Sequence, residues 1–147
     1  MEEYLRYRDS ALELLQDSFC ATALETGRIL ARGLIRENEP QLKALAAQFA
    51  HAPNALPLIG QAAVLGARGN PGVVRATMRG PDLLLITIER CPECRNLKRD
   101  SAFCFLNQGL MTELAESYLR VQIETKESKC TATGSKACEI HVTLAGT

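Results

Sequence analysis

Residues 120–144 read RVQIETKESKCTATGSKACEIHVTL, and this stretch holds two alternating patterns on either side of a turn. The positions of one face are Val121, Ile123 and Thr125 in the first pattern, and Cys138, Ile140, Val142 and Leu144 in the second. Because successive side chains of a strand point to opposite faces, each pattern predicts a half-buried strand. Residues 131–136, with Gly134, supply the turn. We therefore expect a β-hairpin with Cys138 pointing inward.

The sequence before this hairpin changes from helical to strand-like periodicity. The helical segments are 3–36, 41–50, 56–65 and 101–119, and the strand-like segments are 73–78 and 83–88. The first helical segment is long, so we expect a break near Thr26-Gly27. This order predicts an α+β fold, in which a helical N-terminal half packs on a small, mainly antiparallel sheet with a C-terminal strand–helix–strand–strand unit.

Composition narrows the class of protein. A length of 147 residues predicts a single domain, 1–147. Seventeen basic and seventeen acidic residues cancel, which argues against a nucleic-acid partner. No apolar stretch approaches the roughly 20 residues that a membrane span needs, and MEEYLRYRD is not followed by a signal-peptide hydrophobic region. We expect a cytoplasmic protein in a reducing compartment.

The six cysteines are unevenly distributed. Cys20 stands alone and is interpreted as a small buried apolar residue. The other five fall within 48 residues, at Cys91, Cys94, Cys104, Cys130 and Cys138. In a reducing compartment such a cluster favours metal binding or redox chemistry over structural disulfides.

Two tetrahedral ligand sets fit the spacing, and both contain Cys130 and Cys138, which the hairpin brings together. The first set adds Cys104, whose thiolate an early helical position favours, and Glu127. Zinc accepts this mixture of sulfur and oxygen. The second set adds Cys91 and Cys94 of the CPEC motif, and its four thiolates also suit an iron–sulfur cluster. CPEC has the spacing of a redox dithiol as well.

Residues 83–145 resemble the 4-vinyl reductase domain family, whose fold is similar to that of a small subunit of vesicle-tethering complexes. The match rests on LLLITIERC, AFCFLNQGLMTELAESYL and the hairpin. The family pattern is a helical cysteine, a glycine, a strand ending in Glu-x-x-Cys, a glycine turn and a last cysteine. The matching positions are Cys104, Gly109, Glu127, Cys130, Gly134 and Cys138. The resemblance implies zinc on the first ligand set, although Glu124 competes with Glu127 and CPEC departs from the pattern.

The resemblance further implies a non-catalytic domain that captures an apolar ligand, either an aromatic compound or a tetrapyrrole. The candidate pocket residues are Phe103, Phe105, Leu106, Leu110 and Met111. A homodimer and a protein partner are also expected. The alternatives are an enzyme or accessory protein of chlorophyll or tetrapyrrole metabolism, and an iron–sulfur or redox protein using Cys91 and Cys94. His51 and His141 are interpreted as surface residues.

Overall fold

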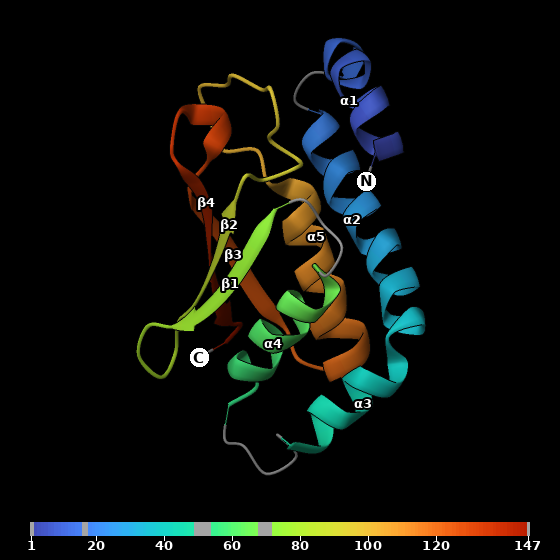
Figure 1. Cartoon of the computed structure of the whole chain (residues 1–147), viewed down its shortest axis with the longest axis vertical. Coiled ribbons are helices and arrows are strands. Elements are labelled where there is room, and N and C mark those ends of the chain that lie inside the picture. Colours follow the sequence, from blue (N-terminus) through green and yellow to red (C-terminus); the bar gives the residue numbers. More distant parts are fainter. Residues whose placement is uncertain (1, 16–17, 49–53, 68–71, 147) are drawn as a thin grey trace.

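Two β-hairpins form a four-stranded antiparallel sheet in this computed structural model, which describes residues 2–15, 18–48, 54–67 and 72–146. The strands are β1 (Val73–Met78), β2 (Leu84–Glu89), β3 (Ile123–Lys129) and β4 (Ala137–Leu144). Their order across the sheet is β1-β2-β4-β3, so the two hairpins meet where β2 pairs with β4 (Figure 1). All three pairings are antiparallel, as the alternating sequence patterns predicted.

The helices lie on one side of this sheet. They are α1 (Glu2–Leu15), α2 (Ser18–Glu37), α3 (Glu39–Gln48), α4 (Leu56–Gly66) and α5 (Phe105–Glu113), and α5 continues as a π-helical turn (Leu114–Leu119). α4 packs against β1 and β2, α5 packs against β3, and α2 lies along the outer side of α5 (Figure 1). The predicted α+β architecture is confirmed. None of the described helices has the length and apolar character needed to cross a membrane.

The core lies between the sheet and the helices. Ile86 and Ile88 of β2 and Ile140 and Val142 of β4 are all buried. Burying an aliphatic side chain of this size stabilises the fold by about 1.5–3 kcal/mol. The antiparallel register pairs Ile88 with Cys138, so the chain leaves β2 beside the cysteine of the second hairpin.

The predicted break near Thr26-Gly27 is wrong, because α2 continues through both residues. Gly27 serves a helix contact instead. A Cβ atom at Gly27 would lie 2.1 Å from the carbonyl oxygen of Leu106 on α5, and one at Gly109 would lie 2.0 Å from the carbonyl oxygen of Leu24. The two helices therefore approach backbone to backbone, and each supplies the glycine that this distance requires.

Charged side chains hold the same two helices together. The carboxylate of Glu113 is 2% exposed and accepts hydrogen bonds from Arg28 Nε at 3.0 Å and Arg32 Nε at 2.8 Å. Arg28 also reaches Glu116 at 2.7 Å. The hydrogen bond from Arg32 holds the pKa of Glu113 below its ordinary value. A buried carboxylate between two guanidinium groups fixes the lateral position of α5 on α2.

Gly27→Ala is expected to lower the free energy of unfolding by about 1–3 kcal/mol, because the methyl group would push α5 away from α2. Gly33→Ala on the same helix is the matched control, since a Cβ atom there meets nothing within 4 Å. Alanine is a better helix former than glycine, so the control should be neutral or stabilising by up to about 1 kcal/mol. Urea denaturation measures both variants, and equal effects would contradict this account of the contact.

Candidate metal centre

Five thiols form one buried cluster between the sheet and α5. The Sγ atom of Cys94 lies 3.3 Å from that of Cys104, 3.4 Å from Cys130 and 3.8 Å from Cys138, and Cys91 lies 3.6 Å from Cys104. All five are at most 3% exposed. With metal–sulfur bonds of about 2.3 Å, the sulfurs of a tetrahedral site are about 3.8 Å apart. The cluster therefore has nearly the dimensions of a metal–thiolate site.

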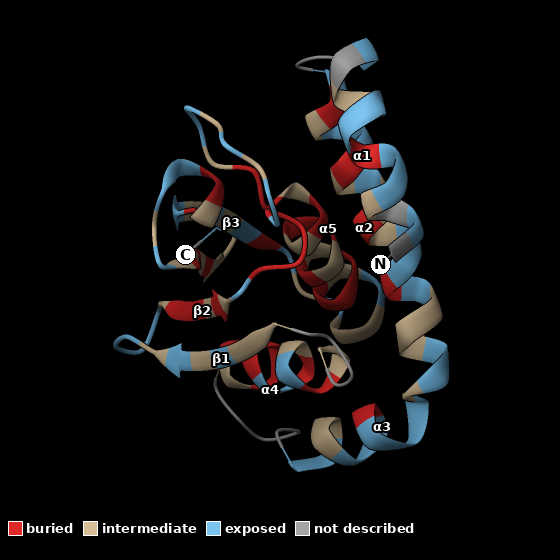
Figure 2. Cartoon of the chain, turned by 45° about the horizontal axis from the view of Figure 1, so that its top comes forward, coloured by how far each residue is buried: buried red, intermediate tan, exposed pale blue. Residues whose placement is uncertain are grey.

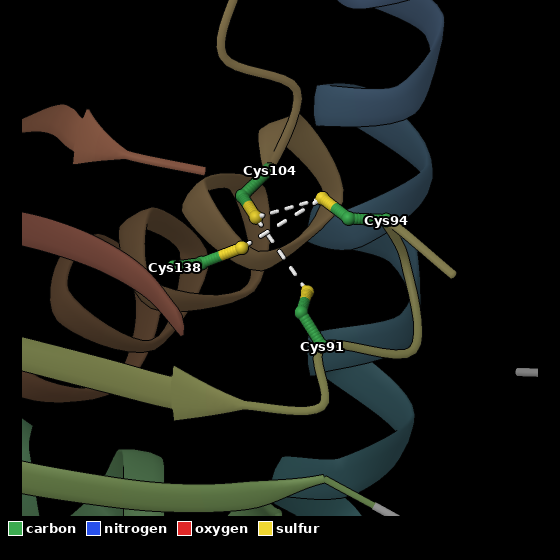
Figure 3. Close-up of side chains that lie close together, drawn as sticks. All are labelled: Cys91, Cys94, Cys104 and Cys138. Carbon is green, nitrogen blue, oxygen red and sulfur yellow. Dashed lines mark hydrogen bonds between the residues drawn. The ribbon is translucent and has the colours of Figure 1, made fainter. Parts of the chain in front are cut away.

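The cysteines come from four parts of the fold, and the side chains of four of them point toward one another in Figure 3. Cys91 and Cys94 lie in the loop after β2, which is buried over residues 91–94 (Figure 2). Cys104 directly precedes α5, Cys130 follows β3, and Cys138 lies on β4. Cys104 was expected in the first helical turn and occupies the N-cap position instead.

A β-bulge brings Glu127 and Cys130 to the same face. In a regular strand, residues three apart point to opposite faces. Here the pairing with β4 shifts between Glu127, opposite Ile140, and Lys129, opposite Glu139, so one extra residue is inserted. Glu124, the competing carboxylate, is exposed. The spacing Glu-x-x-Cys thus places a carboxylate and a thiol together only because the strand is bulged.

Glu127 has one oxygen that its surroundings leave without a donor. Its Oε2 atom accepts a hydrogen bond from the Cys104 backbone N–H at 2.8 Å. Its Oε1 atom is buried and has no hydrogen-bond partner in the described part of the chain. Burial raises the pKa of Glu127 to about 8. An unsatisfied buried acceptor is costly, and a metal ion at this position would satisfy it.

The potential ligands fall into two overlapping groups, in each of which the ligand atoms lie within 4.8 Å of one another. One group is Cys104, Glu127, Cys130 and Cys138, which is the first predicted set. The other is Cys91, Cys94, Cys104 and Cys138, which has Cys104 where the second predicted set has Cys130. The pair common to both groups is Cys104 and Cys138, because Cys104 lies between the CPEC loop and the second hairpin.

The thiols share their protons unevenly. Hydrogen bonds, chiefly from Cys104, lower the pKa of Cys138 to about 3. The Thr131 backbone N–H also points at Cys138 Sγ, at 3.3 Å. The pKa of Cys104 is raised, because its thiol donates to its neighbours, Cys130 foremost. One thiolate thus forms easily, whereas further ionisation within the cluster needs a cation.

Glu93, in the middle of CPEC, was not identified from the sequence as a site residue. Its side chain is fully buried at the N-terminus of α5. Oε1 accepts from the Leu106 N–H at 2.7 Å, and Oε2 accepts from the Asn107 N–H at 3.2 Å and from Asn107 Nδ2 at 2.7 Å. Burial raises the pKa of Glu93 well above its usual range, while these hydrogen bonds act in the opposite direction. The carboxyl group thus caps a helix that begins twelve residues later in the chain.

Arg8 of α1 is a second residue that sequence reasoning missed. It is 4% exposed, and its Nη1 atom donates to the backbone carbonyl of Glu93 at 2.8 Å. The first helix is therefore attached to the loop that carries Cys91 and Cys94. The sequence held no signal for this contact, since an arginine in an amphipathic helix is usually exposed.

A cavity of about 90 Å³ lies beside the cluster, between α2, α3, α4, α5 and the first two strands. Of the predicted pocket residues, Leu110 and Met111 line it. Phe103 and Leu106 are instead buried in the core, and Phe105 is half-buried with its ring edge-on to Phe103 at 6.0 Å. The cavity wall is otherwise mostly aliphatic.

Asn107 joins the cavity to the thiol cluster. It lines the cavity, and its Nδ2 atom lies 2.7 Å from Glu93 Oε2 and 3.8 Å from Cys91 Sγ. A molecule in the cavity could therefore contact a side chain that itself contacts the cluster.

Glu93→Gln is expected to lower the free energy of unfolding by about 1–3 kcal/mol, because the amide would turn an NH₂ group toward the N–H groups that Glu93 now accepts. Glu89→Gln is the control, since Glu89 is exposed and pairs only with Arg75 at the surface. Such pairs contribute at most about 1 kcal/mol. If chemical denaturation finds both variants equally stable, the helix-capping role of Glu93 is wrong.

Known proteins share both the sequence pattern and the fold. Residues 84–144 match the family model of the 4-vinyl reductase domain. An uncharacterized protein of Methanocaldococcus jannaschii, MJ0745, is 30% identical over 73 residues, which are 50% of this chain and 39% of that protein. The chain thus spans about two fifths of the length of this relative.

Among solved structures, a vinyl-4-reductase family protein of M. jannaschii is 12% identical, with a TM-score of 0.55 over 99% of this chain and 81% of that one. Trafficking protein particle complex subunit 3 of Naegleria fowleri, covalently bound to palmitic acid, is 14% identical, with a TM-score of 0.64 over 95% and 91%.

Two sensor proteins are similar as well. The phenol-responsive sensory domain of the transcription activator PoxR, solved with phenol, is 15% identical, with a TM-score of 0.62 over 90% of this chain and 69% of that one. An H-NOX protein of S. oneidensis is 15% identical, with a TM-score of 0.60 over 95% and 72%. At these identities the structures show a shared fold. The predicted resemblance is confirmed, and residues 84–144 of this chain belong to the 4-vinyl reductase domain family.

Proposed function

We propose that this chain is a non-catalytic, zinc-containing protein that binds a small aromatic compound. The observation that carries the proposal is the apolar cavity beside the thiol cluster, with Asn38 and Asn107 as polar groups in its lining. Apolar walls with a few polar side chains are typical of small-molecule sites. The fold shared with the PoxR sensory domain, which was solved with phenol, supports the same class of ligand.

The size of the cavity favours a single aromatic ring over a tetrapyrrole. An engineered cavity of about 150 Å³ holds benzene, so about 90 Å³ requires small movements for one ring and far larger ones for a tetrapyrrole. His141 is half-buried on the sheet face away from the helices and lies 3.2 Å from Ser128 Oγ. It therefore does not face the cavity as a heme ligand would, and His51 lies outside the described residues.

The proposed zinc ligands are Cys104, Glu127, Cys130 and Cys138. Zinc fits because one donor is a carboxylate oxygen that has no other partner among the described residues. An ion at this position would tie the second hairpin to the N-terminus of α5, and its role would be structural. The all-thiol group with Cys91 and Cys94 keeps an iron–sulfur or redox protein as the second candidate. Iron–sulfur protein would be brown, whereas zinc protein is colourless.

The setting proposed for this function is a homodimer in the cytoplasm. Exposed apolar side chains on α1 and α2, among them Tyr7, Leu14 and Ile29, offer a surface for self-association. Reduced cysteines would be kept as metal ligands in that compartment. The concentration dependence of the mass measured by light scattering tests the dimer.

Purified wild-type protein is expected to contain zinc, and Cys104→Ser is expected to lose it, because Cys104 is a member of both ligand groups. Cys20→Ser is the matched control, since Cys20 is half-buried on α2 and belongs to neither group. Elemental analysis of protein prepared under reducing conditions measures both. Full zinc content in Cys104→Ser would refute the site.

Phenol is expected to bind wild-type protein, and Ala63→Leu is expected to weaken binding at least about tenfold, since the larger side chain occupies the cavity. Val64→Leu is the control on the next residue of α4, because Val64 is exposed and is not part of the lining. Titration calorimetry with phenol provides the affinities. Equal affinities in the two variants would show that phenol does not use this cavity.

A further inference from the structure

We propose that the cluster holds two metal ions, bridged by the thiolates of Cys104 and Cys138. The proposal rests on the zinc site proposed above and adds a second ion, held by Cys91 and Cys94 together with the two bridging cysteines. The site would be a dinuclear thiolate centre for divalent ions that accept tetrahedral sulfur coordination, zinc foremost.

The number of ligands agrees with two ions. Two tetrahedral ions have eight coordination positions, and two bridging thiolates each fill one position on both ions, so six ligand residues are needed. The two groups of ligands supply six residues and share two of them: Cys91, Cys94, Cys104, Glu127, Cys130 and Cys138. A thiolate can bridge because its sulfur has more than one lone pair. Each ion would then have two terminal ligands of its own and two shared ones.

The shared residues lie where bridges must lie. Cys104 Sγ is 3.6 Å from Cys91 and 3.3 Å from Cys94, which would be the terminal ligands of the added ion. On its other side, the backbone N–H of Cys104 donates to Glu127, a terminal ligand of the first ion. Cys138 is a ligand in both groups as well. The cluster is thus continuous from the CPEC loop to the bulge of β3.

A single ion would leave part of this cluster unused. An ion on Cys104, Glu127, Cys130 and Cys138 leaves Cys91 and Cys94 as buried thiols without a metal. An ion on the other group leaves the Oε1 atom of Glu127 buried without a donor among the described residues. Two ions use every donor, which accounts for the burial of all five cysteines and the carboxylate in one place.

The surroundings also suit the charge of a dinuclear centre. Five thiolates and one carboxylate around two divalent ions leave two negative charges. The buried Arg8 guanidinium contacts the loop between Cys91 and Cys94, at the carbonyl of Glu93. The Thr131 N–H points at Cys138 Sγ at 3.3 Å, and Asn107 Nδ2 points at Cys91 Sγ at 3.8 Å. These groups stabilise negative charge on a bridging and a terminal sulfur.

The first test is the number of zinc ions per chain, from elemental analysis and native mass spectrometry of protein purified without oxygen. Wild type and Cys20→Ser should hold two ions. Cys91→Ser should hold one, because only the added ion loses a terminal ligand. Glu127→Gln should also hold one, for the matching reason on the other ion. Cys104→Ser should hold none.

One ion in wild type, retained in Cys91→Ser, would overturn the second ion and leave the proposed zinc site intact. No ion in wild type would overturn both proposals. Iron together with acid-labile sulfide would also overturn the dinuclear centre and favour the iron–sulfur candidate.

The bridges have their own test, which does not depend on whether the variants fold. Wild-type protein exchanged with cadmium-113 should give two NMR resonances that are split by mutual coupling, because the shared sulfurs transmit it. Two resonances without coupling would show two separate ions and overturn the bridged arrangement. A single resonance that accounts for one cadmium per chain would overturn the second ion.

Discussion

The contact between α2 and α5 is the constraint on which the rest of the structure depends. Gly27 and Gly109 let the two backbones touch, and the buried Glu113 between Arg28 and Arg32 prevents the helices from sliding. This contact sets how far α5 lies from the sheet. It therefore sets the position of Cys104 at one end of α5 and the width of the cavity along its side.

The N-terminus of α5 is completed by residues that are distant in sequence. Glu93 from the loop after β2 accepts from Leu106 and Asn107, and Glu127 from β3 accepts from Cys104. Each carboxylate is next to cysteines of its own segment. The groups that satisfy the helix end thus belong to the same segments that bring the thiols together, so forming the helix end and forming the cluster are one event.

The cavity and the cluster meet at Asn107, which contacts Glu93 and lies near Cys91 while lining the cavity. The lining comes from both halves of the chain, because α2, α3 and α4 precede the segment that matches the 4-vinyl reductase domain. The family pattern therefore describes the metal side of the fold, whereas the N-terminal helices supply much of the cavity. A bound molecule would contact both.

The sequence alone determined what depends on neighbouring residues. Alternation predicted the strand of the second hairpin that carries Cys138, and the clustered cysteines with Glu127 predicted a ligand group whose atoms do lie together. Only the tertiary structure revealed the role of Gly27, the burial of Glu93 and Arg8, and the place of Cys104 beside Cys91 and Cys94. The physical reason is that these features depend on distances between segments far apart in the chain. A glycine that breaks a helix and one that admits a neighbouring helix look the same in sequence.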